Sequence, residues 1–298
     1  MSQASALRLL LLSMIWGASF VFYRVAIVEL SAPFLAAMRL LLGALFLAAL
    51  FAVFSKPTNI LQNWRIVSLI AVFASALPFL LFAYAAHTVS ASILVIMNAT
   101  SPIWAAVIAV LWTRTLPPAK ALLGLVLGLL GVAMIVGLDT HTLSTPGTGW
   151  GLLASLGGAA CYGLATNMAT HMGHNIDSRS YALGCLVLGS AMLAPVVPFT
   201  WPQAVPSWPA ILSTLGVGVL CSGVAYLIYF RLVQDVGPTS ALTVTFLTPV
   251  FGVFWGHVVL GEAVGWHTVA GGLTVIVGTG LAAVYGLKKP LPQPAADH

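Results

Sequence analysis

Long apolar stretches, each about 20 residues and separated by short polar joints, constrain the fold of this chain more than any other feature. A helix needs ~20 apolar residues to cross a hydrocarbon core of ~30 Å. The chain is 60% hydrophobic and 6% charged, which is too little charge to cover a soluble protein of 298 residues. The sequence therefore predicts an all-α integral membrane protein with ten transmembrane helices. The predicted spans are 6–28, 32–54, 65–87, 90–112, 119–138, 149–171, 180–200, 208–233, 238–260 and 266–286.

Positive charges sort onto one side of this ten-span arrangement. Nine of the eleven lysines and arginines fall there, and the opposite loops carry almost none. They are Arg8, Lys56, Arg65, Arg114, Lys120, Arg179, Arg231, Lys288 and Lys289. Cytoplasmic loops of membrane proteins are enriched in these residues, so both termini are predicted to be cytoplasmic, in a multi-pass protein of the cell (inner) membrane. The net charge of +5 is then a consequence of topology, the lipid bilayer is the expected surrounding, and no nucleic-acid partner is expected.

Two alternatives to this interpretation are weak. Arg8 precedes an apolar run, as in a signal peptide, but no small-residue cleavage site follows, so the run is kept as a span. Cys161, Cys185 and Cys221 lie inside spans and lack the spacing of metal ligands, so they are interpreted as structural thiols. No catalytic residue, metal ligand or cofactor is predicted.

The sequence repeats itself at a shift of 147 residues. This shift places Pro102 on Pro249, Asn98 on Thr245 and Ser101 on Thr248. Further pairs are Ser75 with Ser222, Phe79 with Tyr226, Phe82 with Tyr229, Gly124 with Gly271, and Gly131 with Gly278. A shift of 146 places Trp16-Gly17 on Tyr162-Gly163. A matched register of polar and proline positions indicates two related halves.

Each half holds five predicted spans, an odd number, so the second half begins on the opposite side of the membrane. The predicted repeats are 1–140 and 141–287, and they are inverted relative to each other. Inverted repeats are typical of secondary transporters, whose sites lie near the midplane between the repeats. Closely spaced prolines predict a disordered cytoplasmic tail over 288–298.

Five segments resemble the EamA-type transporters of the drug/metabolite transporter superfamily. They are IWGASFVFYRVA (15–26), AAMRLLLGAL (36–45), the proline-centred fourth and ninth spans, and VLGEAVGWHTVAGGLTVIVG (259–278). The resemblance covers nearly the whole chain and implies ten helices, cytoplasmic termini, and export or exchange of small metabolites. The chain departs from the family pattern at Thr115, the first-half counterpart of Glu262, and at Arg24, where lysine is more usual.

The two prolines predict hinge points and a central cavity. Pro102 and Pro249 each lie near the middle of a span, where proline kinks a helix and frees the carbonyl four residues earlier. Those carbonyls belong to Asn98 and Thr245, and in lipid they must face protein or a water-filled cavity. A packing kink bonded internally is the alternative.

Aromatic and hydroxyl side chains repeat at helical spacing on the spans around this cavity. Core packing is the alternative for any single one of them, but as a set they describe an apolar pocket with few polar groups. The predicted substrate-binding residues are Trp16, Ser19, Tyr23, Phe79, Phe82, Asn98, Ser101, Trp104, Tyr162, Tyr226, Tyr229, Thr245 and Thr248.

The few charged residues limit the mechanism. All six acids fall at span ends, in loops or in the tail, which argues against a carboxylate-gated exchange of cations for protons. Arg39 is the most deeply embedded charge, and we interpret it as structural, with a substrate anion as the alternative. Arg24 reaches the interface by snorkelling. His87 and His257 lie near span ends, where coupling to protons competes with simple interfacial bonding.

The predicted function is export of small metabolites by alternating access, most favourably aromatic or apolar amino acids. Organic cations or drug-like amphiphiles are the alternative substrates, and phosphate esters come third because the midplane lacks several basic groups. A channel remains a competing hypothesis. An enzyme is not expected, because Leu220-Cys221-Ser222-Gly223 lacks the first glycine of the intramembrane serine-protease motif that it resembles. Glycines of the fifth and tenth spans predict close helix packing, either as a scaffold or as a homodimer contact.

Overall fold

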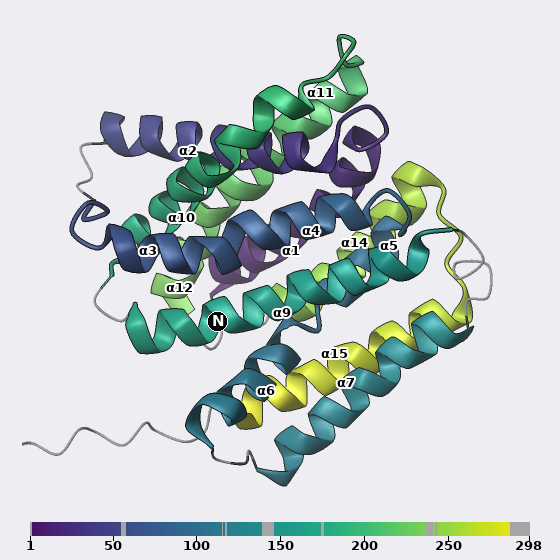
Figure 1. Cartoon of the computed structure of the whole chain (residues 1–298). Helices are drawn as coiled ribbons and strands as arrows, with labels where there is room; N and C mark the ends of the chain where they lie inside the picture. Colours follow the sequence, from purple (N-terminus) through teal and green to yellow (C-terminus); the bar gives the residue numbers. More distant parts are fainter. Residues whose placement is uncertain are drawn as a thin grey trace, which may run out of the picture.

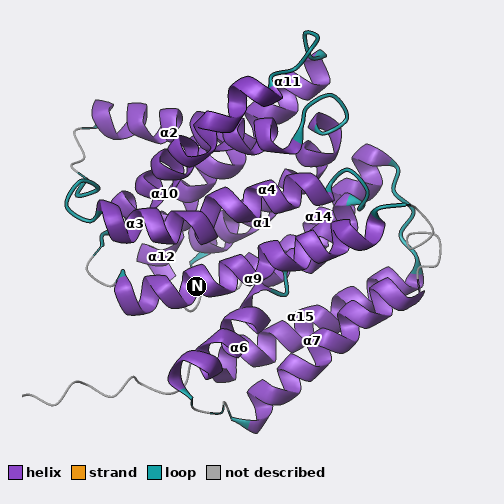
Figure 2. Ribbon diagram, viewed as in Figure 1, coloured by secondary structure: helices purple, strands orange, loops and turns teal. Residues whose placement is uncertain are grey.

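The protein is described by a computed structural model that covers residues 2–54, 58–114, 116, 118–138, 146–173, 176–236, 241 and 244–286. Within these ranges the chain is helical and contains no strand (Figures 1 and 2). The first half forms α1 (Gln3–Ala26), α2 (Ala32–Val53), α3 (Trp64–Ala71), the π-helix η1 (Val72–Ala76), α4 (Leu77–Ala85), α5 (Ala91–Asn98), α6 (Ser101–Thr113) and α7 (Ala119–Leu138). The second half forms α9 (Thr148–Met172), α10 (Ser178–Leu193), the 3-10 helix η2 (Ala194–Thr200), α11 (Trp208–Leu215), the π-helix η3 (Gly216–Val224), α12 (Ala225–Val236), α14 (Val244–Leu260) and α15 (Trp266–Gly286).

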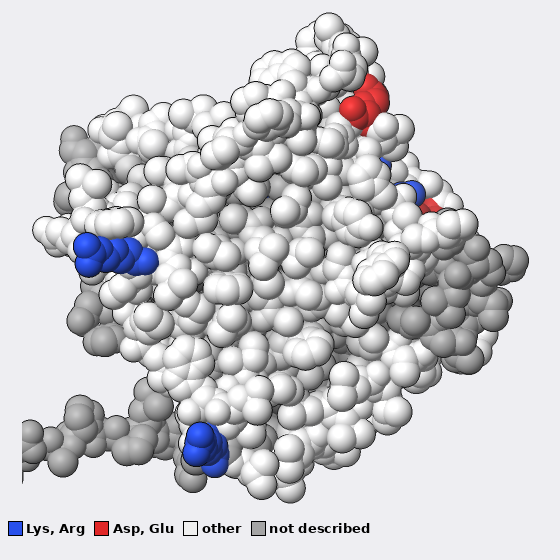
Figure 3. Space-filling view, viewed as in Figure 1, with Lys and Arg blue, Asp and Glu red and all other residues white. Residues whose placement is uncertain are grey.

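Six helical stretches among the described residues are long and apolar enough to cross a membrane. They are 3–26, 32–53, 64–85, 91–113, 178–200 and 208–236. Helices α7, α9, α14 and α15 lie in the other predicted spans. The structure therefore confirms a helical multi-pass membrane protein, whereas the count of ten spans stays a prediction. Figure 3 shows charged side chains at the edges of one face and a broad uncharged band between them, as expected for a surface that faces lipid.

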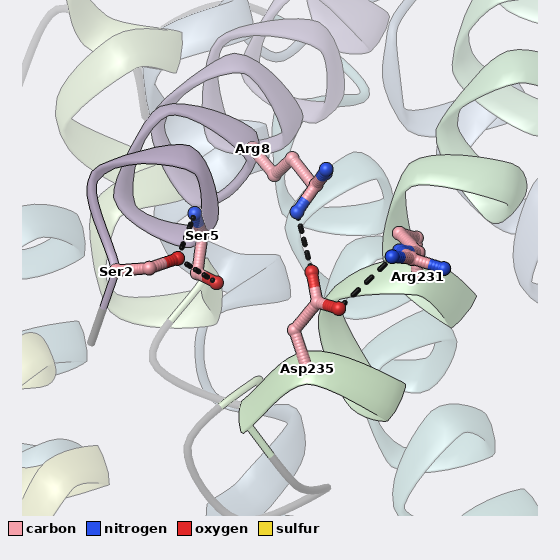
Figure 4. Close-up of polar contacts among 5 residues, drawn as sticks. All are labelled: Ser2, Ser5, Arg8, Arg231 and Asp235. Carbon is pink, nitrogen blue, oxygen red and sulfur yellow. Dashed lines mark hydrogen bonds and ion pairs between the residues drawn. The ribbon is translucent and has the colours of Figure 1, made fainter.

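One end of the bundle carries Arg8, Arg65, Arg179 and Arg231, and we call it the basic end. Here the start of α1 is tied to the end of α12 through one carboxylate (Figure 4). Arg8 donates to Oδ2 of Asp235, and Nε of Arg231 lies 3.2 Å from Oδ1 of the same group. Four of the seven described arginines are thus at this end, and the side of the membrane that it faces stays a prediction.

The opposite end carries two glutamates that link the halves, and we call it the glutamate end. Glu29 accepts hydrogen bonds from the backbone N–H (2.7 Å) and the hydroxyl of Ser207 at the start of α11. These bonds lower the pKa of Glu29. Glu262 accepts from the N–H groups of Ala91 (2.7 Å) and Ser92 (3.0 Å) and from the Ser92 hydroxyl (2.6 Å). Each carboxylate therefore caps a helix of the other half.

Arg24, His87 and His257 also lie at the glutamate end. Arg24 donates to the carbonyl oxygens of Ala86 and His87, at the C-terminal end of α4, so it acts as a helix C-cap there. His87 is close enough to Tyr84 for an edge-to-face ring contact at 6.5 Å. The Nδ1 atom of His257 lies 3.0 Å from the carbonyl oxygen of Glu262.

Glycines bring the two halves together at two equivalent places. Helix α1 packs on α14, where a Cβ at Gly17 would lie 2.7 Å from the backbone nitrogen of Gly252. Helix α9 packs on α6, where a Cβ at Gly163 would lie 2.6 Å from the backbone nitrogen of Ala105. The shifts of 146 and 147 residues carry the first contact onto the second. The repeat in the sequence is therefore also a repeat in the packing.

A second pair of contacts follows the same rule. Helix α2 packs on η3, where a Cβ at Gly43 would lie 3.0 Å from Cβ of Ser222. Helix α10 packs on η1, where a Cβ at Gly189 would lie 2.9 Å from the hydroxyl of Ser75. Each half thus contributes one glycine and one serine to two matching junctions. Two further large contacts, of α2 with α10 and of α7 with α15, join equivalent helices.

Helices α7 and α15 form a pair at one side of the bundle (Figure 1). A Cβ at Gly131 would lie 2.6 Å from the carbonyl oxygen of Gly271, and Gly278 is packed equally closely against Gly128. These glycines are thus used inside one chain. A homodimer through α7 and α15 stays a prediction, and it would use their exposed apolar side chains. Those side chains include Leu122, Leu123, Val126, Leu129, Leu130, Leu273 and Val277.

Candidate functional site

The predicted substrate-binding residues all lie away from the exposed surface. Ser19, Tyr23, Phe79, Phe82 and Thr248 are buried. The other eight are half-buried, namely Trp16, Asn98, Ser101, Trp104, Tyr162, Tyr226, Tyr229 and Thr245. The structure brings several of them into contact, although the set comes from seven helices.

Two runs of aromatic rings meet α1, and together we call them the aromatic cluster. In the first run, the rings of Trp16 and Tyr229 are 5.6 Å apart, and Tyr229 lies 6.1 Å from Phe230 on α12. Phe230 in turn stacks on Tyr226 at 6.0 Å. These spacings are typical of favourable aromatic pairs. Because Trp16 belongs to the first half and α12 to the second, this run crosses between the halves.

The second run joins α1, α4 and α9. The rings of Phe20 and Phe82 meet edge to face at 5.4 Å, and Phe82 stacks on Tyr162 at 6.2 Å. The Phe82 ring also fills the space beside Gly158 on α9, where a Cβ would lie 2.7 Å from it. This run also crosses between the halves, because α9 opens the second half. Sequence reasoning missed Phe20 and Phe230, which stand outside the polar stripes that guided the prediction.

Side-chain donors in this region bond to backbone carbonyls, and two of these bonds cross between the halves. The indole N–H of Trp16 donates to the carbonyl of Cys221 at 3.2 Å, and that of Trp255 donates to the carbonyl of Met14 at 3.1 Å. The hydroxyl of Ser19 donates to the carbonyl of Trp16 at 2.6 Å. These three groups therefore have partners in the protein, and the aromatic cluster offers ring faces to another molecule.

Arg39 lies at the junction of α1, α2, α4 and η3. Its Nη1 donates to the hydroxyl of Tyr23 at 2.8 Å, and its Nε donates to the hydroxyl of Ser222 at 3.1 Å. The guanidinium carbon stands 3.7 Å from the ring centre of Phe79, a cation–π contact. Tyr23 also donates to the carbonyl of Phe79 at 3.4 Å. Two predicted site residues, Tyr23 and Phe79, thus hold a buried positive charge.

The fourth span is broken at Pro102 rather than kinked. Helix α5 ends at Asn98, and α6 begins at Ser101 with Pro102 in its first turn. The hydroxyl of Ser101 donates to the Asn98 carbonyl at 2.6 Å, so the carbonyl that proline was predicted to free is bonded internally. The side-chain oxygen Oδ1 of Asn98 is buried and has no hydrogen-bond partner in the described part of the chain. A buried acceptor of this kind favours a donor that is not part of the chain.

The ninth span keeps its helix through Pro249, so the two prolines differ. Helix α14 is continuous, and Thr248 donates to the carbonyl of Val244 at 2.8 Å. In the fourth span, Thr100 donates to the carbonyl of Met97 at 2.6 Å, a local bond that competes with the helix. Its counterpart at the 147-residue shift is a leucine, which has no such donor. The fourth span therefore has a break beside its proline and the ninth span has a continuous helix, and a hinge role stays a prediction for both prolines.

The third and eighth spans each contain a π-helical segment at the same place. Ser75 lies in η1 and Ser222 in η3, and these residues are paired by the 147-residue shift. Short π segments occur often at functional sites. The wider π turn also rotates the residues after it about the helix axis. A stripe drawn at the α-helical period, such as Ser222 with Tyr226 and Tyr229, therefore does not keep one face through η3.

The family profile of EamA-like transporters matches residues 4–137 and again residues 149–284. The chain belongs to the EamA-like transporter family. The two matches confirm two repeats, each holding one partner of every glycine contact described above. The boundaries predicted at 140 and 141 fall in the gap between the matches.

Similar proteins carry the same general description. An uncharacterized transporter of Archaeoglobus fulgidus is 26% identical over 93% of this chain and 96% of its own length. The uncharacterized transporters YoaV and YvbV of Bacillus subtilis are 25% and 24% identical, over 89% and 91% of this chain and 92% and 89% of their own lengths. A crystal structure of a protein matches with a TM-score of 0.66 over 97% of this chain and 100% of its own, at 14% identity, which supports the fold alone. This EamA-like chain is therefore a membrane transporter by family.

Proposed function

We propose that this EamA-like chain is a secondary transporter that exports amino acids with aromatic or apolar side chains across the cell membrane by alternating access. The observation that carries the proposal is the aromatic cluster, because both of its runs cross between the two halves. A site between inverted repeats is exposed to either side as the halves rock. Ring faces suit an aromatic or apolar substrate, which gains ~0.5–1.5 kcal/mol per well-placed ring pair beyond area burial.

The buried Oδ1 of Asn98 supplies a complementary polar group. An amino acid carries an ammonium with three donors, and the unpartnered Asn98 oxygen is an acceptor. The break between α5 and α6 lies close to the cluster in the fold, because Gly163 packs against Trp104 and Ala105, and its neighbour Tyr162 stacks on Phe82. One end of a substrate would meet rings and another would meet Asn98.

Organic cations are the second candidate. Aromatic rings bind cations by themselves, so the cluster alone does not discriminate. The four described acids lie at the two ends of the bundle, in Glu29, Asp177, Asp235 and Glu262. A proton-driven cation exporter normally uses a carboxylate inside the membrane, so the acids favour amino acids over cations.

Counterflow in proteoliposomes tests this proposal. Purified protein is reconstituted and given a panel of labelled amino acids, with and without a pH gradient. We expect saturable exchange of tryptophan or phenylalanine. Exchange of a labelled organic cation, with none for any amino acid, would replace the proposal by the second candidate. Flux that does not saturate and shows no counterflow would indicate a channel.

Substitutions locate the site in the same assay. Tyr229→Ala and Asn98→Ala are each expected to lower the exchange rate about ten-fold, the effect of losing ~1.4 kcal/mol of substrate interaction. Tyr84→Ala is the matched control, because Tyr84 is 47% exposed and lies outside the aromatic cluster. Full activity of both site variants, with normal folding by size-exclusion chromatography, would show that the site lies elsewhere.

A further inference from the structure

Arg39 lies beside one of two equivalent helix junctions, and the other junction has no charged residue at the matching position. The 146-residue shift carries Gly43 onto Gly189 and Arg39 onto Cys185. Gly43 packs against Ser222, and Gly189 packs against Ser75. The same glycine–serine junction therefore exists once with an arginine beside it and once with a cysteine.

The junction without the arginine closes with neutral groups. The hydroxyl of Ser75 donates to the carbonyls of Cys185 (3.0 Å) and Ala71 (2.9 Å). At the other junction, Ser222 donates to the carbonyl of Val217 at 3.1 Å and accepts from Nε of Arg39. Packing of these helices thus does not require a guanidinium, since the matching pair forms without one. This comparison weakens the purely structural interpretation of Arg39.

No described acid balances the Arg39 charge. Asp235 pairs with Arg8 and Arg231, Glu29 and Glu262 cap helices of the opposite half, and Asp177 caps α10. Arg39 is only 8% exposed, and its described partners are two hydroxyls and the rings of Phe79 and Tyr23. A buried charge without a counter-ion is costly, so an anion is the missing partner.

The guanidinium also keeps donors available. Its hydrogen bonds within the described residues use Nε and Nη1, and none uses Nη2. Arginine holds a carboxylate best through two parallel N–H bonds, here from Nη1 and Nη2. Phe79 beneath the guanidinium and Tyr23 beside it fix the plane of this fork. The fork is thus positioned before any ligand arrives.

We propose that Arg39 binds the carboxylate of the transported molecule and makes the protein selective for organic carboxylates. This inference rests on the proposed transport function and deepens it by naming the recognised group. The apolar body of the substrate would extend along the aromatic cluster. Tyr23 is on α1 with Trp16 and Phe20 of the cluster, and Phe79 is on α4 with Phe82. A free organic cation, in contrast, would be repelled by the buried charge.

Four probes that share one phenyl skeleton test the recognised group. They are phenylalanine, phenylalaninamide, 3-phenylpropionate and phenethylamine. Binding to the purified full-length protein in detergent is measured by calorimetry. We expect phenylalanine and 3-phenylpropionate to bind at least about ten-fold more tightly than the amide and the amine, the ratio for one charged contact of ~1.4 kcal/mol. Tighter binding of the amine than of 3-phenylpropionate would overturn the proposal.

Variants assign the preference to Arg39. In Arg39→Gln, the ratio of the affinity for phenylalanine to the affinity for phenylalaninamide is expected to fall close to one. Phenethylamine is expected to bind to this variant as well as before or better. Arg39→Lys keeps the charge without the planar fork, so it is expected to retain part of the ratio. Arg65→Gln, a change at an exposed arginine of the basic end, is the control and is expected to keep the full ratio.

A structural role would give a different pattern, because it would weaken all four probes equally and leave the ratio unchanged. An unchanged ratio in folded Arg39→Gln, or in Arg39→Lys if the glutamine variant does not fold, would overturn the proposal. The proposed function fails separately. If 3-phenylpropionate binding depends on Arg39 but no amino acid shows counterflow, Arg39 is an anion site and the proposed function is wrong. If amino acids show counterflow but Arg39→Gln keeps the full ratio, the proposed function stands and only the role of Arg39 is wrong.

Discussion

Gly17→Ala and Gly163→Ala are each expected to destabilise the protein by about 1–3 kcal/mol, the usual cost of overpacking a tight core. The added methyl groups would lie 2.6–2.7 Å from backbone nitrogens of the facing helices, far inside normal contact distance. Backbone atoms cannot rotate away as a side chain can, so α1 must move off α14, or α9 off α6. Because the two sites are equivalent, their effects should be similar in size.

Gly149, in the same helix as Gly163, provides the control for this prediction. Gly149 also lies in α9, but a Cβ there would meet nothing within 4 Å. Alanine is a better helix former than glycine by about 0.5–1 kcal/mol, so Gly149→Ala should raise stability slightly. Thermal unfolding in detergent, followed by fluorescence-detected size exclusion, measures all three. If Gly163→Ala and Gly149→Ala change the unfolding temperature in the same direction, the close packing at Gly163 is contradicted.

Glu262→Ala is expected to lower the free energy of unfolding by about 2 kcal/mol, since bonds from a carboxylate to helix N–H groups are among the stronger ones. The carboxylate satisfies the first two N–H groups of α5, and Ser90 satisfies the third through its hydroxyl. Without Glu262, these two donors lose their partners. Amide hydrogen exchange at residues 91 and 92 should therefore become faster.

Glu29→Ala is the reciprocal control for Glu262→Ala. It should speed exchange at the start of α11, at Ser207 and the residues after it, and leave α5 unchanged. Its effect on stability should be smaller, because Glu29 is exposed and its bonds compete with water. Unchanged exchange in α5 of Glu262→Ala, measured by mass spectrometry, would show that this cap does not form in the membrane protein.

The general architecture could be predicted from the sequence because it depends on simple physical patterns. Apolar length predicts spans, and the distribution of arginine predicts which loops share an end. The 146-residue shift that pairs Gly17 with Gly163 also predicts their matching contacts, because a small residue allows close helix approach. These features depend on residue type and spacing, which the sequence states directly.

The local structure of the site could not be predicted, because it depends on competition between groups of similar strength. Pro102 and Pro249 have the same chemistry, but Thr100, whose hydroxyl bonds to the carbonyl of Met97, has a leucine as its counterpart near Pro249. The π-helices η1 and η3 shift the helical phase, which no 3.6-residue pattern includes. For Arg39, the sequence gives its depth, but its partners Tyr23 and Ser222 become known only when α1, α2 and η3 are packed.

The contact between Gly17 and Gly252 joins the first and ninth spans, so it has a consequence for biosynthesis. At ~5–20 residues per second, the ninth span leaves the ribosome tens of seconds after the first. During that interval α1 is in the bilayer without α14, the helix that packs against Gly17. The carbonyl of Met14 also lacks its hydrogen-bond donor, the indole N–H of Trp255. The first half therefore cannot complete its packing until the second half has been made. Two separately expressed halves should therefore be degraded when alone and assemble when they are made in the same cell.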